Sequence, residues 1–289
     1  MKEIFTTIRN YIAFAISAII ALLGLANLEM GKVSEPEKDT VRIMSFNIRC
    51  GEFPDRGEIV PRLIADYHPD SVGLQECTYD WYNYLRLFLE DEYEFVGVGR
   101  DTGDRGSKCG EMSLVLYRKD KYNLVDSGTF WLSETPDEVS RGWDGACNRI
   151  CTWVLLENKE TGERYAHVNT HLDHEGPLAR QNGVELVKEK ALSFDVPTVV
   201  TGDFNFKKGT DLYTSLVTGG LIDTQDAAVH TMYGKTYHAY NGGSEGDPID
   251  FICVNDKIGE VKTYKIIRDM YDGKYTSDHY PVFSDVVVS

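Results

Sequence analysis

Short apolar segments rich in β-branched and aromatic residues recur along the chain from Val41 onward. Each of them ends in polar or glycine residues, which is typical of β-strands. The pattern predicts about ten strands: Val41–Ile48, Ser71–Leu74, Tyr93–Val98, Met112–Tyr117, Thr152–Leu156, Tyr165–Thr170, Thr198–Thr201, Ile249–Val254, Val261–Ile267 and Val282–Val288.

Three segments show helical spacing instead, and we predict helices at Gly57–His68, Tyr79–Glu92 and Leu178–Phe194. The aromatic stripe of the second helix, which begins at Trp81, is expected to pack into the core. The sequence contains no internal repeat, so solenoids and propellers are disfavoured. Many strands with few helices favour an α+β protein in which two mixed sheets pack together and helices flank them.

A different pattern precedes the strands, because Asn10 to Leu28 contains no charged residue. Residues 1–28 are predicted to be a signal peptide or an N-terminal membrane anchor, and the apolar length lies between the ranges of the two classes. A buried core helix fits less well, since the run lacks a polar stripe. Residues 29–40 then read as a linker and 41–289 as a catalytic domain. We therefore expect export, with the protein either secreted or anchored and facing outside.

Composition narrows the range of partners. The chain has 289 residues, with 30 Lys+Arg against 46 Asp+Glu and a net charge of −16. Tight binding along a nucleic-acid backbone needs many basic contacts, so this charge disfavours it. A small phosphorylated substrate remains compatible with this charge. The six cysteines form no C-x-x-C pair, so buried free thiols and, in an exported protein, disulfides are both open.

Polar clusters follow the predicted strands. Glu76 comes after one strand, Asp203 and Asn205 after another, and His279 stands near the end of the chain with Asp250 as a candidate carboxylate partner. Strand ends on one rim of a sheet bring distant residues together, and buried carboxylates must be paired or bound to metal. The sequence thus predicts a site for a hard cation such as Mg²⁺.

Six motifs occur in a fixed order: Ser45-Phe-Asn47, Gln75-Glu76, Asn169-Thr-His171, Gly202-Asp-Phe-Asn205, Ile249-Asp250-Phe and Ser277-Asp-His279. Together they resemble the signature motifs of the endonuclease/exonuclease/phosphatase superfamily, which has the deoxyribonuclease I-like fold. Further stretches, among them Gly97-Val-Gly-Arg-Asp101, resemble a bacterial branch that is related to deadenylase-like members. The resemblance covers residues 41–289.

The resemblance implies a four-layer α/β/β/α sandwich and a Mg²⁺-dependent or Mn²⁺-dependent hydrolase that cleaves a phosphodiester or phosphomonoester by in-line attack of water. It further implies a metal site in which Glu76 is the principal ligand. Asn47 would order that carboxylate or a water bound to the metal, and Asp278 would join the metal shell.

The same resemblance implies the catalytic roles. Asp203 would orient or deprotonate the attacking water, and Asn205 would contact the scissile phosphate. His171 would donate to a phosphate oxygen. His279, supported by Asp250, would act on the phosphate or as an acid/base.

Substrate-binding candidates surround these motifs. Some relatives carry an acidic residue where this chain has Arg49, which puts a second metal position in doubt and offers a cation for phosphate. Asp173 and His174 directly follow the His171 motif. Arg100 and Arg180 lie near the motifs, although exposed ion pairs would explain them equally well.

A second group of candidates is less tied to the motifs. Asp101 and Glu111 have the same two interpretations as Arg100. Trp131, Trp143 and Tyr237 are aromatic candidates for stacking on a base or sugar, with core packing as the alternative.

Two rival functions follow from other features. Asn169-Thr-His171-Leu-Asp173-His174 nearly spells the zinc motif of metallo-β-lactamases, but an asparagine stands at the first ligand position. The other rival is a surface-anchored binding module with an inactive site. The expected partner is a nucleotide, sugar phosphate, phospholipid headgroup or short oligonucleotide, the last making the protein a nuclease. The membrane is a partner only if the N-terminal segment stays uncleaved, and no obligate protein partner is inferred.

Overall fold

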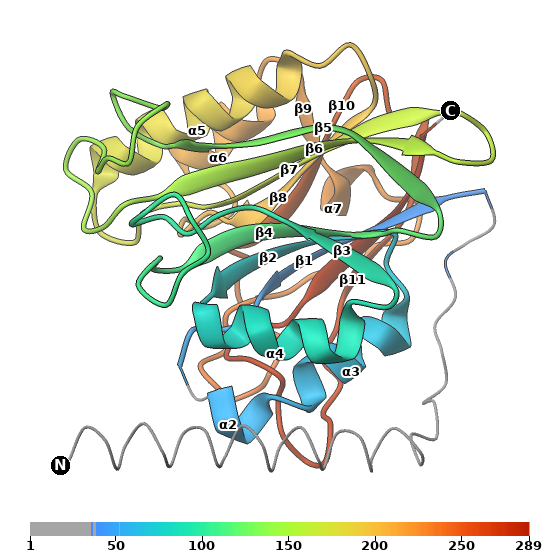
Figure 1. Ribbon diagram of the computed structural model, residues 1–289. Coiled ribbons are helices and arrows are strands. Elements are labelled where there is room, and N and C mark those ends of the chain that lie inside the picture. Colours follow the sequence, from blue (N-terminus) through green and yellow to red (C-terminus); the bar gives the residue numbers. More distant parts are fainter. Residues whose placement is uncertain (1–35, 37–38, 52, 289) are drawn as a thin grey trace, which may run out of the picture. The chain divides into compact units, whose positions relative to one another are not determined.

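Two six-stranded mixed sheets pack face to face in the computed structural model, which describes residues 36, 39–51 and 53–288 (Figure 1). The first sheet has the order β11-β12-β1-β2-β4-β3, with β1 at Val41–Asn47, β2 at Ser71–Cys77, β3 at Tyr93–Val96, β4 at Met112–Arg118, β11 at Glu260–Ile266 and β12 at Val282–Val287. The second has the order β5-β6-β7-β8-β10-β9, with β5 at Tyr122–Trp131, β6 at Ile150–Asn158, β7 at Arg164–His171, β8 at Thr198–Asp203, β9 at Leu221–Asp223 and β10 at Asp250–Asn255.

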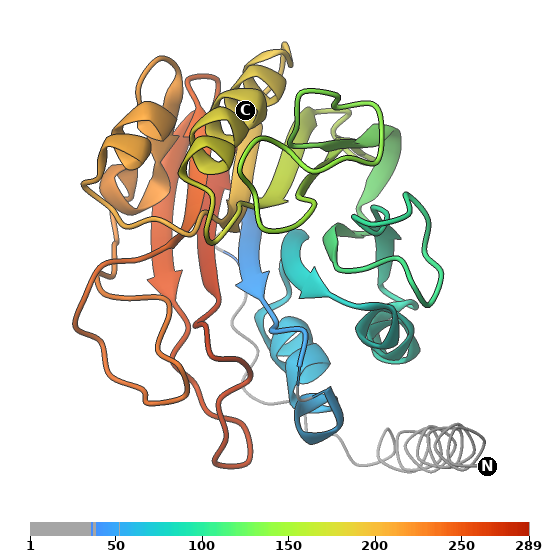
Figure 2. The ribbon, with the colours of Figure 1, turned by 90° about the vertical axis from the view of Figure 1, so that its left-hand side faces the viewer.

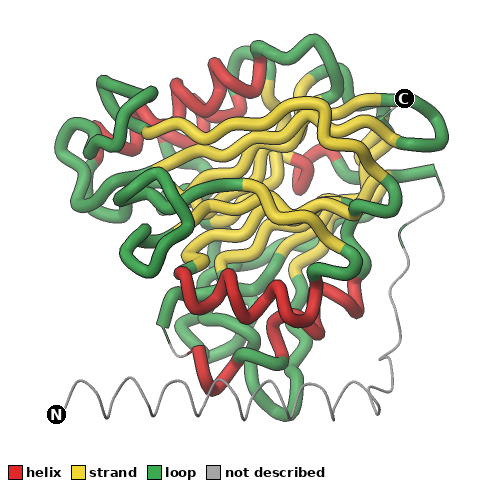
Figure 3. Tube along the Cα trace, viewed as in Figure 1, coloured by secondary structure: helices red, strands yellow, loops and turns green. Residues whose placement is uncertain are grey.

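Helices cover the outer faces of both sheets, as the views in Figures 2 and 3 show. On the first sheet these are α3 at Ile59–Tyr67 and α4 at Tyr79–Leu89, preceded by the short α2 at Phe53–Arg56. On the second they are α5 at Pro177–Leu192 and α6 at Asp211–Val217. The one-turn α7 at Thr224–Ala227 contacts β10 and β11. The predicted α/β/β/α sandwich is therefore confirmed.

The core lies in three layers: between the first sheet and its helices, between the two sheets, and between the second sheet and its helices. Because the inner strands are covered on both faces, β8 and β10 are buried along their whole length and carry charged residues only at Asp203 and Asp250. The stripe of α4 packs into the first layer, where Trp81 is fully buried. Thr78 caps the start of this helix, because its side chain accepts a hydrogen bond from the Trp81 amide.

A polar chain of side chains crosses the space between the sheets, and we call it the intersheet network. The Tyr165 hydroxyl donates to Ser71 Oγ, which lies 2.8 Å from His167 Nδ1. His167 Nε2 lies 2.8 Å from Thr201 Oγ1, and Thr201 donates to Asn169 Oδ1 at 3.0 Å. Since each hydroxyl has one proton to donate, this direction fixes His167 as the neutral tautomer protonated on Nε2.

The intersheet network leaves no room for a side chain on β2. A Cβ atom at Gly73 would lie 2.1 Å from Thr201 Oγ1 and 2.4 Å from Asn169 Oδ1. Asn169 also donates to the carbonyls of Leu74 and Leu114 in the first sheet. The two sheets are thus joined by hydrogen bonds as well as by apolar packing.

The strand prediction was wrong in omitting β5 and β9. β5 is an edge strand with mostly exposed or half-buried residues, so it lacks the apolar run that marks the buried strands. β9 has three residues, and α6 and α7 are also short, which leaves little periodicity to detect. The cysteines are free, with Cys77, Cys109, Cys151 and Cys253 buried.

Segment 1–28, where the sequence predicts a signal peptide or an anchor, lies outside the described residues, as does nearly all of the predicted linker 29–40. The folded part begins with β1 at Val41. Within the part of the chain that the structure describes, no helix has both the length and the apolar character needed to cross a membrane.

Candidate active site

Strand pairing brings five chain segments to one edge of the sandwich. In the first sheet, Asn47 at the end of β1 pairs with Gln75, next to Glu76. In the second sheet, Asp203 at the end of β8 pairs with both His171 and Asp250. Asn47 then bridges the two sheets, because its side-chain amide donates to Glu76 Oε1 at 3.0 Å and to Asp203 Oδ2 at 2.9 Å.

Three predicted site residues have left-handed backbone conformations. The φ angles are 56° at Arg49, 62° at Glu76 and 53° at Asn205. Such conformations are uncommon for residues other than glycine, and they cluster at functional sites. Glu76 stands at the register shift of β2 on β4, and Arg49 and Asn205 each follow the end of a strand by two residues.

Three titratable side chains, Asp203, Asp250 and His279, form a buried cluster at this edge. His279 Nδ1 lies 2.9 Å from Asp250 Oδ2, and its Nε2 lies 3.8 Å from Asp203 Oδ2. His171 Nε2 approaches the same Asp203 oxygen at 3.5 Å. The other Asp203 oxygen accepts a hydrogen bond from the Asn205 amide at 3.0 Å, so residues from several motifs contact Asp203.

The cluster shifts the acidity of its members in opposite directions. Burial and the charge of Asp250 raise the pKa of Asp203. Burial alone would lower the pKa of His279, but the carboxylates of Asp250 and Asp203 outweigh it and raise that pKa to about 10. The pKa of His171 is held well below its usual range by burial and by the nearby Arg149 guanidinium. The protonated His279 thus lies beside Asp203, whose charged form is disfavoured, and near the neutral His171.

Glu76 is held as a carboxylate. Burial would raise its pKa, but hydrogen bonds from the Cys50 amide and from Asn47 lower it below the ordinary value. The Cys50 amide donates to Glu76 Oε2 at 2.9 Å. Each carboxylate oxygen therefore has a fixed orientation, with lone pairs left over for a further ligand.

Asp278 and Arg49 form an ion pair at the edge of this cluster. Asp278 Oδ1 also lies 3.3 Å from Ser277 Oγ, and the Ser277 hydroxyl donates to the Asn47 carbonyl at 2.7 Å. The arginine that replaces an acidic residue of some relatives thus directly contacts the predicted metal ligand. Its guanidinium also lies 5.6 Å from the centre of the Tyr240 ring.

The comparisons with known proteins agree with this geometry. The model of the endonuclease/exonuclease/phosphatase family matches residues 44–279. The chain belongs to this family. A family structure from Bacteroides vulgatus is 36% identical with a TM-score of 0.80, and covers 87% of this chain and 100% of its own. A mannosyl-6-phosphatase from Bacteroides thetaiotaomicron is 32% identical with a TM-score of 0.79, and covers 86% of this chain and 99% of its own.

A curated relative is the Ccr4 exoribonuclease subunit of the CCR4-Not complex from Emericella nidulans, 23% identical over 282 residues. This match covers 72% of the chain and only 42% of that relative's length. The endonuclease/exonuclease/phosphatase family consists of hydrolases that act on phosphoester bonds, and the protein is such a hydrolase.

Enzymes of this family typically depend on a divalent metal, and the donor set of this member fits one. Asp203, Asp250 and His279 have the spacing of metal ligands, but a protonated His279 has no free lone pair, so the carboxylates are the donors that fit. Asp250 Oδ1 is buried and accepts no hydrogen bond within the described chain. Glu76 adds a carboxylate across the Asn47 bridge. Oxygen-rich sets of this kind suit Mg²⁺ or Mn²⁺.

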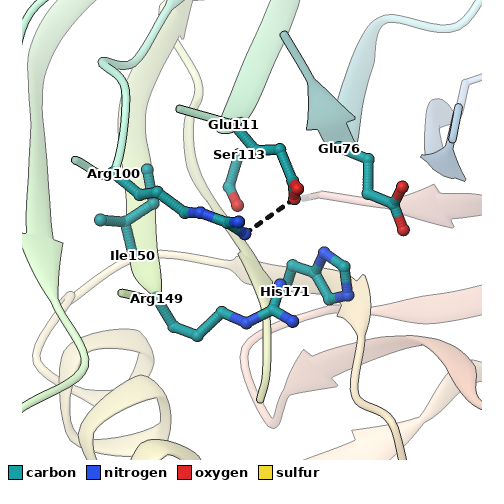
Figure 4. Close-up of a pocket in the computed structure, with 7 residues that line it drawn as sticks. All are labelled: Glu76, Arg100, Glu111, Ser113, Arg149, Ile150 and His171. Carbon is teal, nitrogen blue, oxygen red and sulfur yellow. Dashed lines mark hydrogen bonds and ion pairs between the residues drawn. The ribbon is translucent and has the colours of Figure 1, made fainter. Parts of the chain in front are cut away.

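A small pocket of this family member adjoins the cluster on the side of β6. Figure 4 shows its lining, in which the side chains of Arg100 and Arg149 extend toward Glu111 and His171 while Glu76 lies at the opposite side. Arg100 Nη1 donates to Glu111 Oε2 at 2.8 Å. Burial raises the pKa of Glu111, as does the charge of Glu76, although Arg100 opposes both.

Asp173 and Arg180, which the sequence predicts to bind substrate, make structural contacts here. The Asp173 carboxylate accepts hydrogen bonds from the amides of Ala146, Cys147, Glu175 and Gly176. Arg180 donates to the Asp173 carbonyl at 3.0 Å. Both residues therefore hold the loops beside the pocket in place by hydrogen bonds. The half-exposed His174 contacts Arg149 instead, with its Nδ1 3.1 Å from Arg149 Nη2.

The zinc interpretation of the His171 segment does not fit the geometry. Asn169 points into the intersheet network instead of toward Asp173 and His174. Among the described residues, His171 joins neither of the two groups that have metal-ligand spacing, and Asp173 and His174 group with Cys147 instead.

The three aromatic candidates differ in exposure. Trp131 is buried and donates to the Arg100 carbonyl at 2.7 Å, so it holds the backbone of a residue that lines the pocket. Trp143 is half-buried. Tyr237 is 46% exposed, and its ring centre lies 5.0 Å from that of His279, which leaves it as the aromatic side chain at the mouth of the site.

Arg149 is the site residue that the sequence reasoning missed. It directly precedes β6, and the register of β6 on β7, with Cys151 opposite Thr170, places it alongside His171. The signal in the sequence was a basic residue directly before an apolar run that pairs with a motif strand. Without the strand register, that arginine looks like any other loop charge.

Proposed function

We propose that this protein hydrolyses a small phosphorylated molecule by in-line attack of water, with Mg²⁺ or Mn²⁺ as cofactor. The observation that carries the proposal is the buried Asp203–Asp250–His279 cluster, which Asn47 links to Glu76. Phosphoryl transfer requires an aligned nucleophile and neutralisation of charge on the phosphoryl oxygens, and this arrangement contains groups for both.

Asp203 is the group that receives a proton from the attacking water. Its raised pKa brings it closer to neutral pH, which suits a general base. The Asn205 amide fixes one Asp203 oxygen, while the Asn205 side chain donates to the Leu172 carbonyl and keeps a second N–H for a phosphoryl oxygen.

His279 acts as the cation beside the phosphoryl group. Its pKa of about 10 keeps it protonated at neutral pH, and Asp250 fixes the orientation of its ring. His171, which is neutral, presents a ring N–H to the phosphate. Together they stabilise the negative charge that the transition state spreads over the phosphoryl oxygens.

Glu76 would hold the divalent ion, with Asn47 orienting its carboxylate and Asp278 at the edge of the same shell. The chemistry that such an ion supplies is neutralisation of phosphoryl charge and stabilisation of the leaving oxygen. Carboxylate and amide oxygens at these positions are the ligands that this chemistry requires.

Among substrate classes, we favour a sugar phosphate. The mannosyl-6-phosphatase of Bacteroides thetaiotaomicron resembles this chain over nearly its whole length, and the net charge of −16 disfavours a long polyanion. A short oligonucleotide is the second candidate, which the similarity to Ccr4 exoribonuclease subunits supports.

The test is a panel of sugar phosphates, nucleotides, phospholipid headgroups and short oligonucleotides, assayed with Mg²⁺, with Mn²⁺ and with chelator. Glu76→Gln and His279→Ala are each compared with Glu160→Gln, a change at an exposed surface residue. We expect metal-dependent phosphate release that both site variants lose and the control keeps. Full activity in both site variants would refute the assignment, and silence of the whole panel would favour the binding-module alternative.

A further inference from the structure

The pocket beside the cluster contains more hydrogen-bond donors than the protein uses. Arg149 is 7% exposed, yet its Nε and Nη1 donate no hydrogen bond within the described chain, and neither does Arg100 Nε. His171 Nδ1, beside them, also has no partner there. Arg149 Nε lies 3.8 Å from the nearest Asp173 oxygen, which is beyond hydrogen-bond distance. Buried polar groups are rarely left without partners, so these atoms indicate a ligand.

The two arginines are not equivalent. Arg100 is already paired with Glu111 at 2.8 Å, so its charge is compensated inside the pocket. The carboxylate nearest to Arg149 is Asp173, whose oxygens accept four backbone N–H groups. Arg149 thus has the less compensated guanidinium, aimed at the centre of the pocket beside His171 (Figure 4).

The chemistry of these donors selects an oxyanion. A guanidinium presents a planar fork of N–H groups that matches two oxygens of a phosphate or carboxylate. The pocket is also lined by Glu76 and His171, so a phosphate in the active site would place its oxygens at the pocket mouth.

The size of the pocket restricts which oxygen enters. Its free volume is about 10 Å³, which is room for about one water-sized group. A terminal phosphoryl oxygen has this size. An esterified oxygen carries a carbon substituent, for which this volume has no further room.

We propose that this pocket receives a terminal oxygen of a phosphomonoester, and that Arg149 makes the enzyme prefer phosphomonoesters to phosphodiesters. This inference rests on the proposed function, because it assigns the class of phosphoester that the same site cleaves. A monoester dianion brings one more charge and one more terminal oxygen than a diester, and Arg149 supplies the matching donors.

Binding is the first test, because it does not depend on turnover. Inorganic phosphate and dimethyl phosphate are titrated by calorimetry at about pH 8, where phosphate is a dianion, with Mg²⁺ and with chelator. The variants are Arg149→Met and Arg149→Lys. The matched control is Arg164→Met, an exposed arginine of β7 that pairs with Glu157.

We expect phosphate to bind the wild type at least about tenfold more tightly than dimethyl phosphate. Arg149→Met should weaken phosphate binding about 10- to 100-fold, as expected for lost hydrogen bonds to a charged group, and change dimethyl phosphate binding little. Arg149→Lys should fall between the two, because it keeps the charge without the fork. Equal binding of both probes, or an unchanged ratio in Arg149→Met, would overturn the proposal.

Turnover separates this inference from the function on which it rests. The ratio of kcat/KM for 4-nitrophenyl phosphate to that for bis(4-nitrophenyl) phosphate should exceed one in the wild type and in Arg164→Met, and fall in Arg149→Met. Metal-dependent cleavage without an effect of Arg149 on the ratio would refute the inference alone. Circular dichroism checks the fold, and Arg149→Lys serves if Arg149→Met does not fold.

Discussion

Two buried polar regions lie between the same two sheets, and they are built in opposite ways. In the intersheet network, Ser71, His167 and Thr201 each donate to or accept from a neighbouring side chain. At the edge of the sandwich, Asp250 Oδ1, His171 Nδ1 and two nitrogens of Arg149 have no such partner within the described chain.

The two regions also differ in the charge of their side chains. The network contains only neutral groups, and burial lowers the pKa of His167 to about 3. The cluster at the edge keeps Asp203 beside Asp250 although the charge of Asp250 disfavours that of Asp203. Satisfied polar groups hold the sheets together, whereas unsatisfied and strained ones mark where a substrate and an ion belong. Three substitutions test this division.

The largest effect is expected from Asp203→Asn. Loss of the general base should lower kcat by about 10²- to 10⁴-fold. Burial and Asp250 already disfavour the Asp203 charge, and removing that charge should offset the hydrogen bond lost where the new amide N–H faces Asn47 or Asn205. The free energy of unfolding at neutral pH should therefore change little. Turnover with Mg²⁺ and urea unfolding in chelator measure the two quantities. A variant that keeps its activity, or one that is clearly less stable, would contradict the division.

A smaller and opposite effect is expected from Thr201→Val. The change keeps the shape but removes the hydroxyl, which leaves His167 Nε2 without a partner and Asn169 Oδ1 with Gln75 alone. We expect a loss of about 1–3 kcal/mol in the free energy of unfolding, with kcat per folded molecule nearly unchanged. Thr218→Val, at an exposed position, is the control and should stay within about 0.5 kcal/mol. Equal stability of the two variants would show that the network contributes nothing.

The smallest effect concerns pH and His167. Its pKa is lowered to about 3 in the folded protein, from a model-peptide value of 6.5, so the unfolded chain binds the extra proton between those values. Stability contributed by neutral His167 is thus present above about pH 6.5 and lost as the pH falls toward 3. Protonation of His167 Nδ1 would also remove the acceptor to which the Ser71 hydroxyl donates.

In His167→Gln, the slope of unfolding free energy against pH between about 4 and 6 should fall by up to about 1.4 kcal/mol per pH unit. Urea unfolding at a series of pH values, without metal, gives that slope. Burial also lowers the pKa of His238, to about 4, so a residual slope should remain. An unaltered slope would mean that His167 is already protonated or solvated when folded.

The sequence predicted the sandwich because its inner strands are buried on both faces, which leaves short segments without charged residues, such as 198–202 of β8 and 251–254 of β10. It failed at β5, where exposed residues hide the strand, and at the short β9. The motif residues Asn47, Glu76 and Asp203 were visible because they stand where apolar runs stop.

The Arg149 pocket was not visible for a physical reason. Its donors are identified by missing partners, and partners depend on strand register and on loop positions that a single sequence does not specify. Asp173 shows the converse case, since its place after the His171 motif predicted substrate contact while its oxygens are taken by backbone amides.

The order of strands in the first sheet has a consequence for how the protein becomes active. β1 pairs with β12, and these two strands lie at opposite ends of the folded region. Pairing over such a long stretch of chain is slow, because loop closure precedes any gain in contacts. His279 lies just before β12, so the step that completes the first sheet also brings this residue into the site. We therefore expect refolding molecules to gain activity in a single late phase, together with closure of the first sheet.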